Sequence, residues 1–446
     1  MRRRLRQVAY LLTAAFVAYC CMGFLKTRIS PDPVRSDWLV TQPPPTAAGV
    51  ADASGEPANG GDEIELRGVL SVHTGRSQDA EGTLEEVARA AADAQLDFVV
   101  LGDHVGDWLD PEQAALEPHH LEGVLLVPGV ELPITDWGRS LAVGLDTVTR
   151  TWAAGPVALA ERLGPQGGFL SVVHPRSPRA RERWQDVHAP GADAWEVLDV
   201  SEQVRLRLRE PWALYHALSF LSGQLGGWSH EALLRLNHEG LQGSGMMAYD
   251  SARASRPLSL TAGLNHHAKT RILGEPFPDF GSIFRTLVNH VELDAPLSRN
   301  PRFARDQVLT ALRGGRAFVS LGAATQAEGF RFRAHTGAGV ARSGDVVEWQ
   351  PGAVLIVQAP PGAGAETWAR MIGDGQEVGW FAIEAGEHVA VEAARPGIYR
   401  VELYRPGISL ARIGLGGRRF NMRPWILSNP IEFTQPSASL TVLTSG

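Results

Sequence analysis

The chain has 446 residues, of which 44% are apolar and 20% are charged, and this ordinary globular composition excludes a largely disordered protein. Lysine and arginine number 42 against 49 aspartate and glutamate residues, a net charge of −7, so we expect no nucleic-acid partner, because binding to phosphates needs a basic face. The only cysteines are Cys20 and Cys21, which excludes a disulfide framework, a cysteine–zinc site and a cysteine nucleophile further along the chain.

Residues 1–29 have the pattern of an export signal. Four arginines among the first six residues precede an apolar run from Val8 to Phe24. This run is at the lower length limit for a membrane-spanning helix, and no small-residue cleavage site follows it. Because the arginines precede the helix, we predict an exported protein held in the membrane by an uncleaved signal anchor, with its globular part periplasmic or extracellular. A cleaved signal, which would give a secreted protein, is the alternative.

The remaining chain divides into three parts by composition. Residues 30–62 are rich in proline, glycine and alanine and are expected to be a disordered tether. Residues 63–325 alternate short apolar strands with helices, which indicates an α/β domain with a parallel sheet, open or closed into a barrel. Residues 201–250 interrupt this alternation and suggest a helical insertion. Residues 326–446 carry short strands between turns, which predicts an antiparallel β-sandwich accessory domain.

A helix is expected after the first strand of the α/β domain. Thr83 and Glu86 have the spacing of a capping box, in which each side chain bonds the backbone N–H of the other residue. Leu84, Val87 and Ala91 then share one face of the predicted helix.

Histidine or glutamate side chains follow five apolar segments of the predicted α/β domain. These residues are His73, His104, Glu131, His174 and His267. In a parallel barrel the carboxyl ends of the strands share one face, so we expect the five side chains in one cavity, with neighbouring tips within about 6 Å. Imidazole and carboxylate together are typical ligands of zinc, manganese or iron. The pattern therefore predicts a divalent metal site.

At these residues the sequence resembles the PHP (polymerase and histidinol phosphatase) superfamily of metal-dependent phosphoesterases. The matching segments are Gly68–Thr74, Leu101–His104, Val127–Glu131, Val173–Pro175 and Ala262–His267. The resemblance implies a distorted seven-stranded, TIM-like β/α barrel that holds two or three metal ions and hydrolyses phosphoesters or phosphodiesters. The segment Leu309–Val319, followed by a sandwich, is similar to exported members with a C-terminal β-domain.

Several family positions carry different residues. Ser71 stands where the family has the first histidine of H-x-H, and Asn265 replaces the aspartate of D-x-H. Gln78 occupies a usual aspartate position, although Asp79 is adjacent. Arg139 lies in the region where the family often has a further histidine. The metal ligands that the resemblance leaves are His73, His104, Glu131, His174 and His267, and the catalytic carboxylates it suggests are Asp103 and Glu131.

These substitutions make the predicted pocket more positive. Glu131 is the one certain carboxylate left among the family's ligand positions, so we expect one or two metal ions, or none, rather than three. Arg139 is expected to point towards Glu131 or His174 and to supply part of the positive charge that a metal ion would otherwise provide. Glu196 lies inside a predicted strand, where it either faces the mouth of the barrel or is a hydrogen-bonded core residue.

Two functions remain open on the sequence. One is an exported metallohydrolase of the phosphoesterase type, with a reduced metal site that activates water against a phosphoester or other small molecule. The alternative is a catalytically inactive relative that serves as an anion-binding or protein-interaction module of the cell envelope, with protein partners unknown. The candidate substrate- or anion-binding residues are Ser71, Arg139, Arg176, Asn265 and Lys269. For Arg176 and Lys269 taken separately, an ordinary surface charge is the preferred interpretation.

Overall fold

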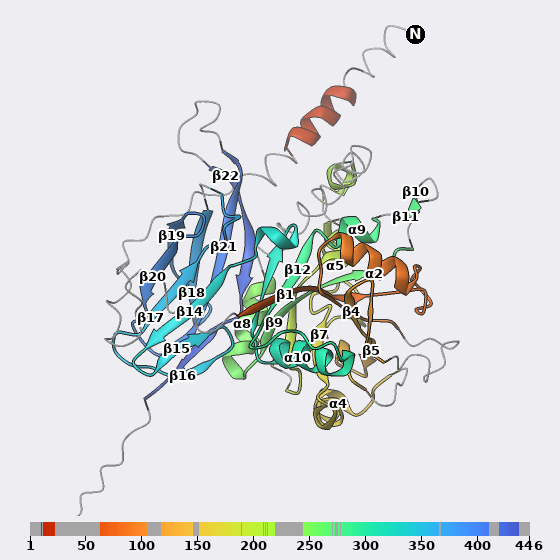
Figure 1. Ribbon diagram of the computed structural model, residues 1–446. Coiled ribbons are helices and arrows are strands. Elements are labelled where there is room, and N and C mark those ends of the chain that lie inside the picture. Colours follow the sequence, from red (N-terminus) through yellow and green to blue (C-terminus); the bar gives the residue numbers. More distant parts are fainter. Residues whose placement is uncertain are drawn as a thin grey trace, which may run out of the picture.

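The structure is a computed structural model of the chain. The residues that it describes are 10, 12–22, 63–104, 117–145, 151–188, 190–207, 209, 211, 213–218, 244–269, 271–272, 275–276, 278–364, 367–409 and 419–436. They form a mixed α/β structure with a large sheet and a smaller four-stranded sheet (Figure 1). The predicted α/β class is confirmed at this level, whereas the predicted tether at residues 30–62 lies outside the described residues.

One part of the large sheet is a ring of hydrogen-bonded strands. Its strands are β1 (Ile64–Val72), β2 (Phe98–Leu101), β4 (Val124–Val127), β5 (Gly129–Ile134), β6 (Gly138–Val143), β7 (Phe169–Val173), β8 (Ala194–Asp199) and β9 (Ser259–His266). β1 pairs in parallel with β2 and with β9, and β2 continues to β4 and, through the Asp103–Val130 bridge, to β5. The order then runs through β6, β7 and β8 back to β9.

The ring is parallel except around β6. β6 pairs antiparallel with both β5 and β7, whereas the pairs β7–β8 and β8–β9 are parallel. The carboxyl ends of β1, β2, β5, β7, β8 and β9 therefore lie on one side of the ring. Since β6 runs the other way, its first residues lie on that same side, where Arg139 is paired with Pro133 and Val173.

Helices bury apolar residues against these strands. The capping box at Thr83 and Glu86 is present at the start of α2 (Leu84–Asp93), which confirms the prediction from the sequence, and Val87, Ala88 and Ala91 of this helix are buried. α4 (Gly155–Leu163) contributes Leu159 and Leu163 to the same apolar core. α10 (Pro301–Arg313) packs into a second apolar core with β2, β4 and β6. The Asn300 side chain caps this helix by accepting the backbone N–H groups of Arg302 and Phe303, and the helix begins at Pro301.

The large sheet continues beyond the ring into the C-terminal part of the chain. β12 (Leu287–Leu293) pairs with β1, β13 (Ala317–Leu321) with β12, and β22 (Arg419–Ser428) with β13. Beyond β22 lie β21 (Gly397–Ser409), β18 (Thr367–Gly373) and β19 (Gln376–Ile383). β16 (Val346–Glu348) and β23 (Ile431–Thr434) complete this region as a parallel pair.

The smaller sheet has the order β15 (Gly339–Arg342), β14 (Arg331–Thr336), β17 (Val354–Gln358) and β20 (His388–Glu392). Its inner residues, including Phe332 and Leu355, share one apolar core with Met371, Leu403 and Phe433 of the large sheet. The two layers are seen to the left of the ring in Figure 1.

The predicted insertion is described only in part. α5 (Val200–Arg207) and α8 (Ser244–Ser255) are helical, as are residues 213–218, whereas residues 219–243 lie outside the described residues. The other helices and strands described are β3 (His119–Leu121), β10 (Arg271–Ile272), β11 (Glu275–Pro276) and α9 (Phe280–Ile283).

The prediction of an exported, membrane-anchored protein is contradicted by the structure. Residues 10 and 12–22 are helical. Among all described residues, we find no helix with the length and apolar character required to cross a bilayer.

Asn429 links the ring to the C-terminal strands. Its buried side chain accepts the N–H of Leu260 at 2.6 Å and donates to the carbonyl oxygens of Leu260 at 3.1 Å and Ala317 at 2.9 Å. One amide thereby satisfies backbone groups of β9 and β13 that are enclosed by protein.

We expect Asn429→Ala to lower the free energy of unfolding by about 3 kcal/mol, because it leaves buried backbone groups without partners. Urea denaturation of the full chain measures the loss. Asn300→Ala, which removes an exposed helix cap, is the control and should cost about 1 kcal/mol. Equal losses for the two variants would contradict a special role of Asn429.

Candidate metal centre

The five predicted ligand residues meet on the side of the ring where its parallel strands end. His73 follows β1, His104 lies just past β2, Glu131 lies in β5, His174 follows β7 and His267 follows β9. Three residues at these strand ends have a positive φ that is uncommon outside glycine: Ser71 (59°), His174 (53°) and Asn265 (46°). Strained backbone of this kind clusters at functional sites, where the surrounding fold maintains it.

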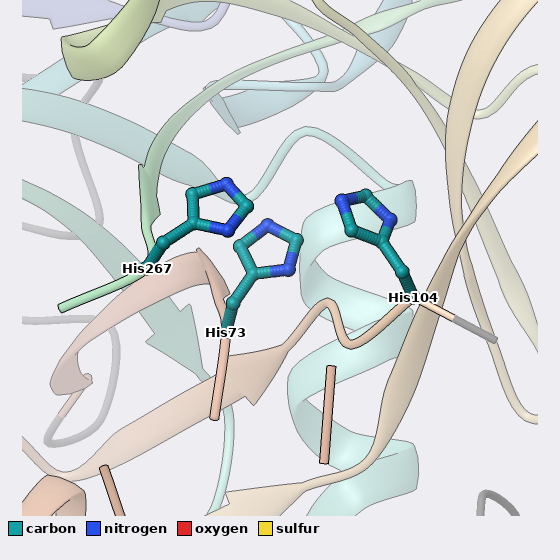
Figure 2. A group of neighbouring side chains, drawn as sticks. All are labelled: His73, His104 and His267. Atoms are coloured by element: carbon teal, nitrogen blue, oxygen red, sulfur yellow. The ribbon is translucent and has the colours of Figure 1, made fainter. Parts of the chain in front are cut away.

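Three histidines form a compact group, which we call the histidine triad: His73, His104 and His267. Figure 2 shows the His73 ring between the other two. It stacks on the His267 ring with centroids 4.1 Å apart and lies 4.7 Å from the His104 ring. One nitrogen of each ring lies within 4.8 Å of the others, an arrangement that could hold a metal ion.

Asp79 lies at the exposed edge of the triad. Its Oδ2 is 3.8 Å from His104 Nε2, and its Oδ1 is 3.6 Å from His267 Nδ1. Although burial would raise the pKa of Asp79, the neighbouring histidines hold it below its usual range, so the carboxylate is ionised. The sequence offered one signal for Asp79: it directly follows Gln78, which occupies the position where the family usually has an aspartate.

Glu131 is the buried carboxylate that joins the triad to the rest of the site. Its Oε2 lies 3.4 Å from His73 Nε2, and its Oε1 lies 3.2 Å from His174 Nε2 and 3.9 Å from His104 Nδ1. Arg139 donates from Nη1 to the same Oε1 at 3.0 Å and lies 3.1 Å from His104 Nδ1. Arg139 thus points towards Glu131, as the charge argument from the sequence expects.

A second group of possible ligands lies on the other side of Glu131. His174, Glu196 and Asp199 are all buried, with one ligand atom of each within 4.8 Å of the others. Asp199 Oδ2 contacts His174 Nδ1, and Glu196 Oε1 accepts the backbone N–H of His174 at 3.1 Å. The sequence left two roles open for Glu196 and did not identify Asp199, although a carboxylate at the end of an apolar strand was a usable signal.

The electrostatic surroundings favour opposite protonation states for two of the histidines. Burial, helped by His267 and His104, lowers the pKa of His73 to about 3, so this ring is neutral and able to coordinate a metal. Burial would also lower the pKa of His174, but Glu131 and Asp199 on its two sides raise it well above the usual value. Although burial opposes ionisation of Glu131, His174 and His104 hold its pKa well below the usual range.

Several polar atoms of the site are buried without a hydrogen-bond partner. They are both ring nitrogens of His73, Glu131 Oε2, Ser71 Oγ and His267 Nδ1. Leaving a buried polar atom unpaired is costly, and such atoms often mark the place of an ion or a water molecule. Nitrogen and carboxylate oxygen are suitable donors for zinc, manganese or iron, so these residues fit a divalent cation.

The remaining candidates have different surroundings. The carboxylate of Asp103 accepts hydrogen bonds from Thr74 N at 2.7 Å, Thr74 Oγ1 at 2.9 Å and Ser77 Oγ at 2.8 Å, so it fixes the loop that carries Asp79. Arg176 lies beside Gly245 at the start of α8, and Lys269 is exposed.

Asn265 connects the two ligand groups. Its Oδ1 is 2.9 Å from His267 Nε2, and its Nδ2 donates to Asp199 Oδ2 at 3.4 Å. The structure also changes the charge argument made from the sequence, which counted one certain carboxylate. Asp79 lies beside His104 and His267, and Glu196 and Asp199 lie beside His174, so the pocket is more acidic than the family positions alone suggest.

Comparison with known proteins gives weak matches only. No family model matches the sequence, and no curated protein matches it. One similar solved structure is Endonuclease Q in complex with a 27-mer duplex substrate that has an abasic lesion at the active site, at 12% identity and a TM-score of 0.30, covering 56% of this chain and 57% of that one. Another is the lesion-specific endonuclease PfuEndoQ from Pyrococcus furiosus, at 12% identity and a TM-score of 0.32, covering 63% and 64%.

The present chain therefore spans less than two thirds of the length of each of these structures. Both are endonucleases, and one holds a 27-mer duplex substrate. Our expectation that nucleic acid is excluded as a partner is therefore not upheld. The physical fault in that expectation is that net charge is a sum over the whole chain and does not describe the charge around one site.

We expect Arg139→Gln to raise the affinity for Mn²⁺ or Zn²⁺ at least about tenfold, because the guanidinium repels a cation beside Glu131. Isothermal titration calorimetry on the metal-stripped chain measures the change. Arg139→Lys keeps the positive charge and should leave the affinity within about threefold of the wild type. A Gln variant that binds metal no more tightly than wild type would show that Arg139 does not compete with the cation.

Proposed function

We propose that this protein is a metal-dependent hydrolase of the PHP type that cleaves phosphoester bonds. With β4 and β5 counted as one strand, the ring of strands has the order of a distorted seven-stranded β/α barrel, which we assign to residues 63–325, with an insertion at 201–250. Residues 326–446 are then the sandwich domain. The site lies at the carboxyl ends of the strands, where barrel enzymes carry their active sites.

The observation that carries this proposal is His73. Its ring is fully buried, both ring nitrogens lack a hydrogen-bond partner, and Nε2 lies 3.4 Å from the equally unpartnered Oε2 of Glu131. A histidine that only filled the core would have its nitrogens satisfied by neighbours. A neutral imidazole that faces a carboxylate and two more imidazoles instead has the donor set of a zinc, manganese or iron site.

Each residue of the site then has a defined task. His73, His104, His267 and Glu131 would hold one divalent cation, which supplies positive charge to lower the pKa of a water molecule and to stabilise a phosphoryl oxygen. Asp79 contacts two of these histidines and orients their rings, as carboxylates beside metal-bound histidines commonly do. Asp103 acts indirectly: its carboxylate accepts hydrogen bonds from Thr74 and Ser77 and so fixes the loop that carries Asp79.

Arg139 provides a fixed positive charge at the edge of the site. Its guanidinium reaches Glu131 and His104 but remains 24% exposed, so the outer donors are accessible to a bound anion. Guanidinium recognises phosphate oxygens well, and the charge on the group persists at any physiological pH. Arg139 therefore orients a phosphoester substrate in this proposal.

A metal-free anion-binding protein is the second candidate function. The observation in its favour is the contact of Arg139 with Glu131, which places a permanent cation where the resemblance suggests a ligand. The surroundings of His73 argue against it, because an anion site gains nothing from a buried neutral imidazole that faces a carboxylate.

We expect Glu131→Gln to lower hydrolysis of bis(p-nitrophenyl) phosphate by about 100-fold or more, because it removes the buried negative charge that a cation needs. Assays with p-nitrophenyl phosphate and with a duplex oligonucleotide that contains an abasic site would define which phosphoester class is cleaved. Activity should disappear on chelation and return with Mn²⁺ or Zn²⁺.

Lys269→Gln is the control, since this exposed cation lies only two residues past His267. It should retain wild-type turnover. Turnover that survives both chelation and Glu131→Gln would contradict a metal-dependent hydrolase, and tight binding of phosphate without any turnover would favour the anion-binding candidate.

A further inference from the structure

We propose that a strip of arginines beside the metal centre binds the phosphate backbone of a nucleic acid, which makes a polynucleotide the substrate of the site. This inference deepens the proposed function and rests on it for the reaction. The arginines come from the loop after β7 and from the end of α5, and we call them the arginine strip: Arg176, Arg179, Arg181, Arg183, Arg205, Arg207 and Arg209.

The loop and the end of α5 lie side by side, although β8 separates them in the sequence. Arg209 donates from Nη1 to the carbonyl oxygen of Pro178 at 3.4 Å, and Arg205 Nη1 lies 3.7 Å from Glu182 Oε2. Glu182 is buried and also pairs with Arg179 at 2.8 Å. Residues 176–183 and 205–209 contain seven arginines and this one acidic residue, so the two segments together carry an excess of positive charge.

Much of this charge is accessible to solvent. The Arg179 side chain is 47% exposed and that of Arg205 31%, and Arg181, Arg183 and Arg209 are exposed residues. In the part of the chain that the structure describes, Arg181 and Arg183 form no ion pair. Their guanidinium groups can therefore bind an external anion without first breaking a contact with the protein, and guanidinium matches the geometry of phosphate oxygens.

The arginine strip begins next to the metal centre. Arg176 lies two residues past His174, and the backbone carbonyl of Glu182 accepts the N–H of Arg139 at 3.2 Å. This hydrogen bond attaches the arginine loop to β6, the strand that brings Arg139 to the site. A phosphate chain bound along the strip would thus lead to Arg139 and to the metal centre.

A polynucleotide is the phosphoester whose charge distribution fits this arrangement. It has a negative charge at every nucleotide, so one strand can contact several arginines at once, and the release of its counterions favours binding. A small phosphoester at the metal centre would contact Arg139 and leave the outer arginines unused. The strip also explains how a chain with a net charge of −7 can bind a polyanion, because its positive charge is concentrated beside one site.

Binding of a fluorescein-labelled DNA duplex to the metal-stripped full chain tests the arginine strip without relying on activity. The double variant Arg181→Gln/Arg183→Gln should weaken binding at least about tenfold at about 0.1 M salt, because it removes two phosphate contacts. It should also reduce the slope of log K against log salt concentration by about 1–2. Fluorescence anisotropy across a salt series measures both quantities.

Arg302→Gln/Arg395→Gln is the matched control. It makes the same change in net charge at two exposed arginines outside the strip, which pair with Glu117 and Asp374. Affinity should stay within about twofold of the wild type, because charges beyond the Debye length of about 10 Å are screened at this salt concentration. Equal losses in the two double variants would mean that only the total charge matters and would overturn the proposal, as would a wild-type chain that does not bind the duplex.

Phosphatidylglycerol vesicles and polyglutamate are the competing polyanions. If either bound the wild type more tightly than the duplex does, and lost that binding in Arg181→Gln/Arg183→Gln, a membrane or an acidic protein would be the partner and the proposal would be overturned.

These outcomes separate the arginine strip from the proposed function. Duplex binding that depends on Arg181 and Arg183, with no turnover of any phosphoester, would support the strip and contradict the hydrolase. Metal-dependent turnover of small phosphoesters without duplex binding would support the hydrolase and contradict the strip.

Discussion

The site depends on a single buried carboxylate, Glu131, which is only 2% exposed yet remains ionised. A buried carboxylate needs compensating positive charge or hydrogen bonds, and Glu131 has His73, His104, His174 and Arg139 around it. Its Oε1 is fully engaged by Arg139 and His174, whereas its Oε2 has no hydrogen-bond partner. This asymmetry accounts for the whole arrangement: one oxygen is neutralised by the protein, and the other faces a neutral histidine and is available to a cation.

The fold serves this constraint through strand direction. Parallel strands of the ring deliver His73, His104, His174 and His267 from one side, and the antiparallel β6 brings the start of a strand, with Arg139, to the same place. The positive φ values at Ser71, His174 and Asn265 show that the backbone is strained at these strand ends. Away from the site, the buried side chain of Asn429 has its hydrogen bonds made and ties the ring to the C-terminal strands.

The sequence predicted the features that depend on local pattern. The capping box of α2 and the polar residues that follow apolar strands could be read directly, because strand ends and helix starts leave short-range signals. It did not predict the roles of Asp199 and Asp103, since each depends on a partner far away in the sequence: His174 for the first and Thr74 for the second.

Two expectations failed. The net charge of the whole chain was used to exclude a nucleic-acid partner, and the composition of a short apolar run was used to predict a membrane anchor. The apolar run near the N-terminus has the composition of a membrane anchor, but among the described residues no helix has the length and apolar character to cross a bilayer.

The central claim is that a cation binds on the free side of Glu131. A crystal structure of the full chain grown with Mn²⁺ and measured at the manganese absorption edge would test it most directly. We predict an anomalous peak within about 2.0–2.3 Å of Glu131 Oε2 and of nitrogens of the histidine triad. Well-ordered crystals with no anomalous peak at Glu131, and with Arg139 as its only cationic contact besides histidine, would contradict it.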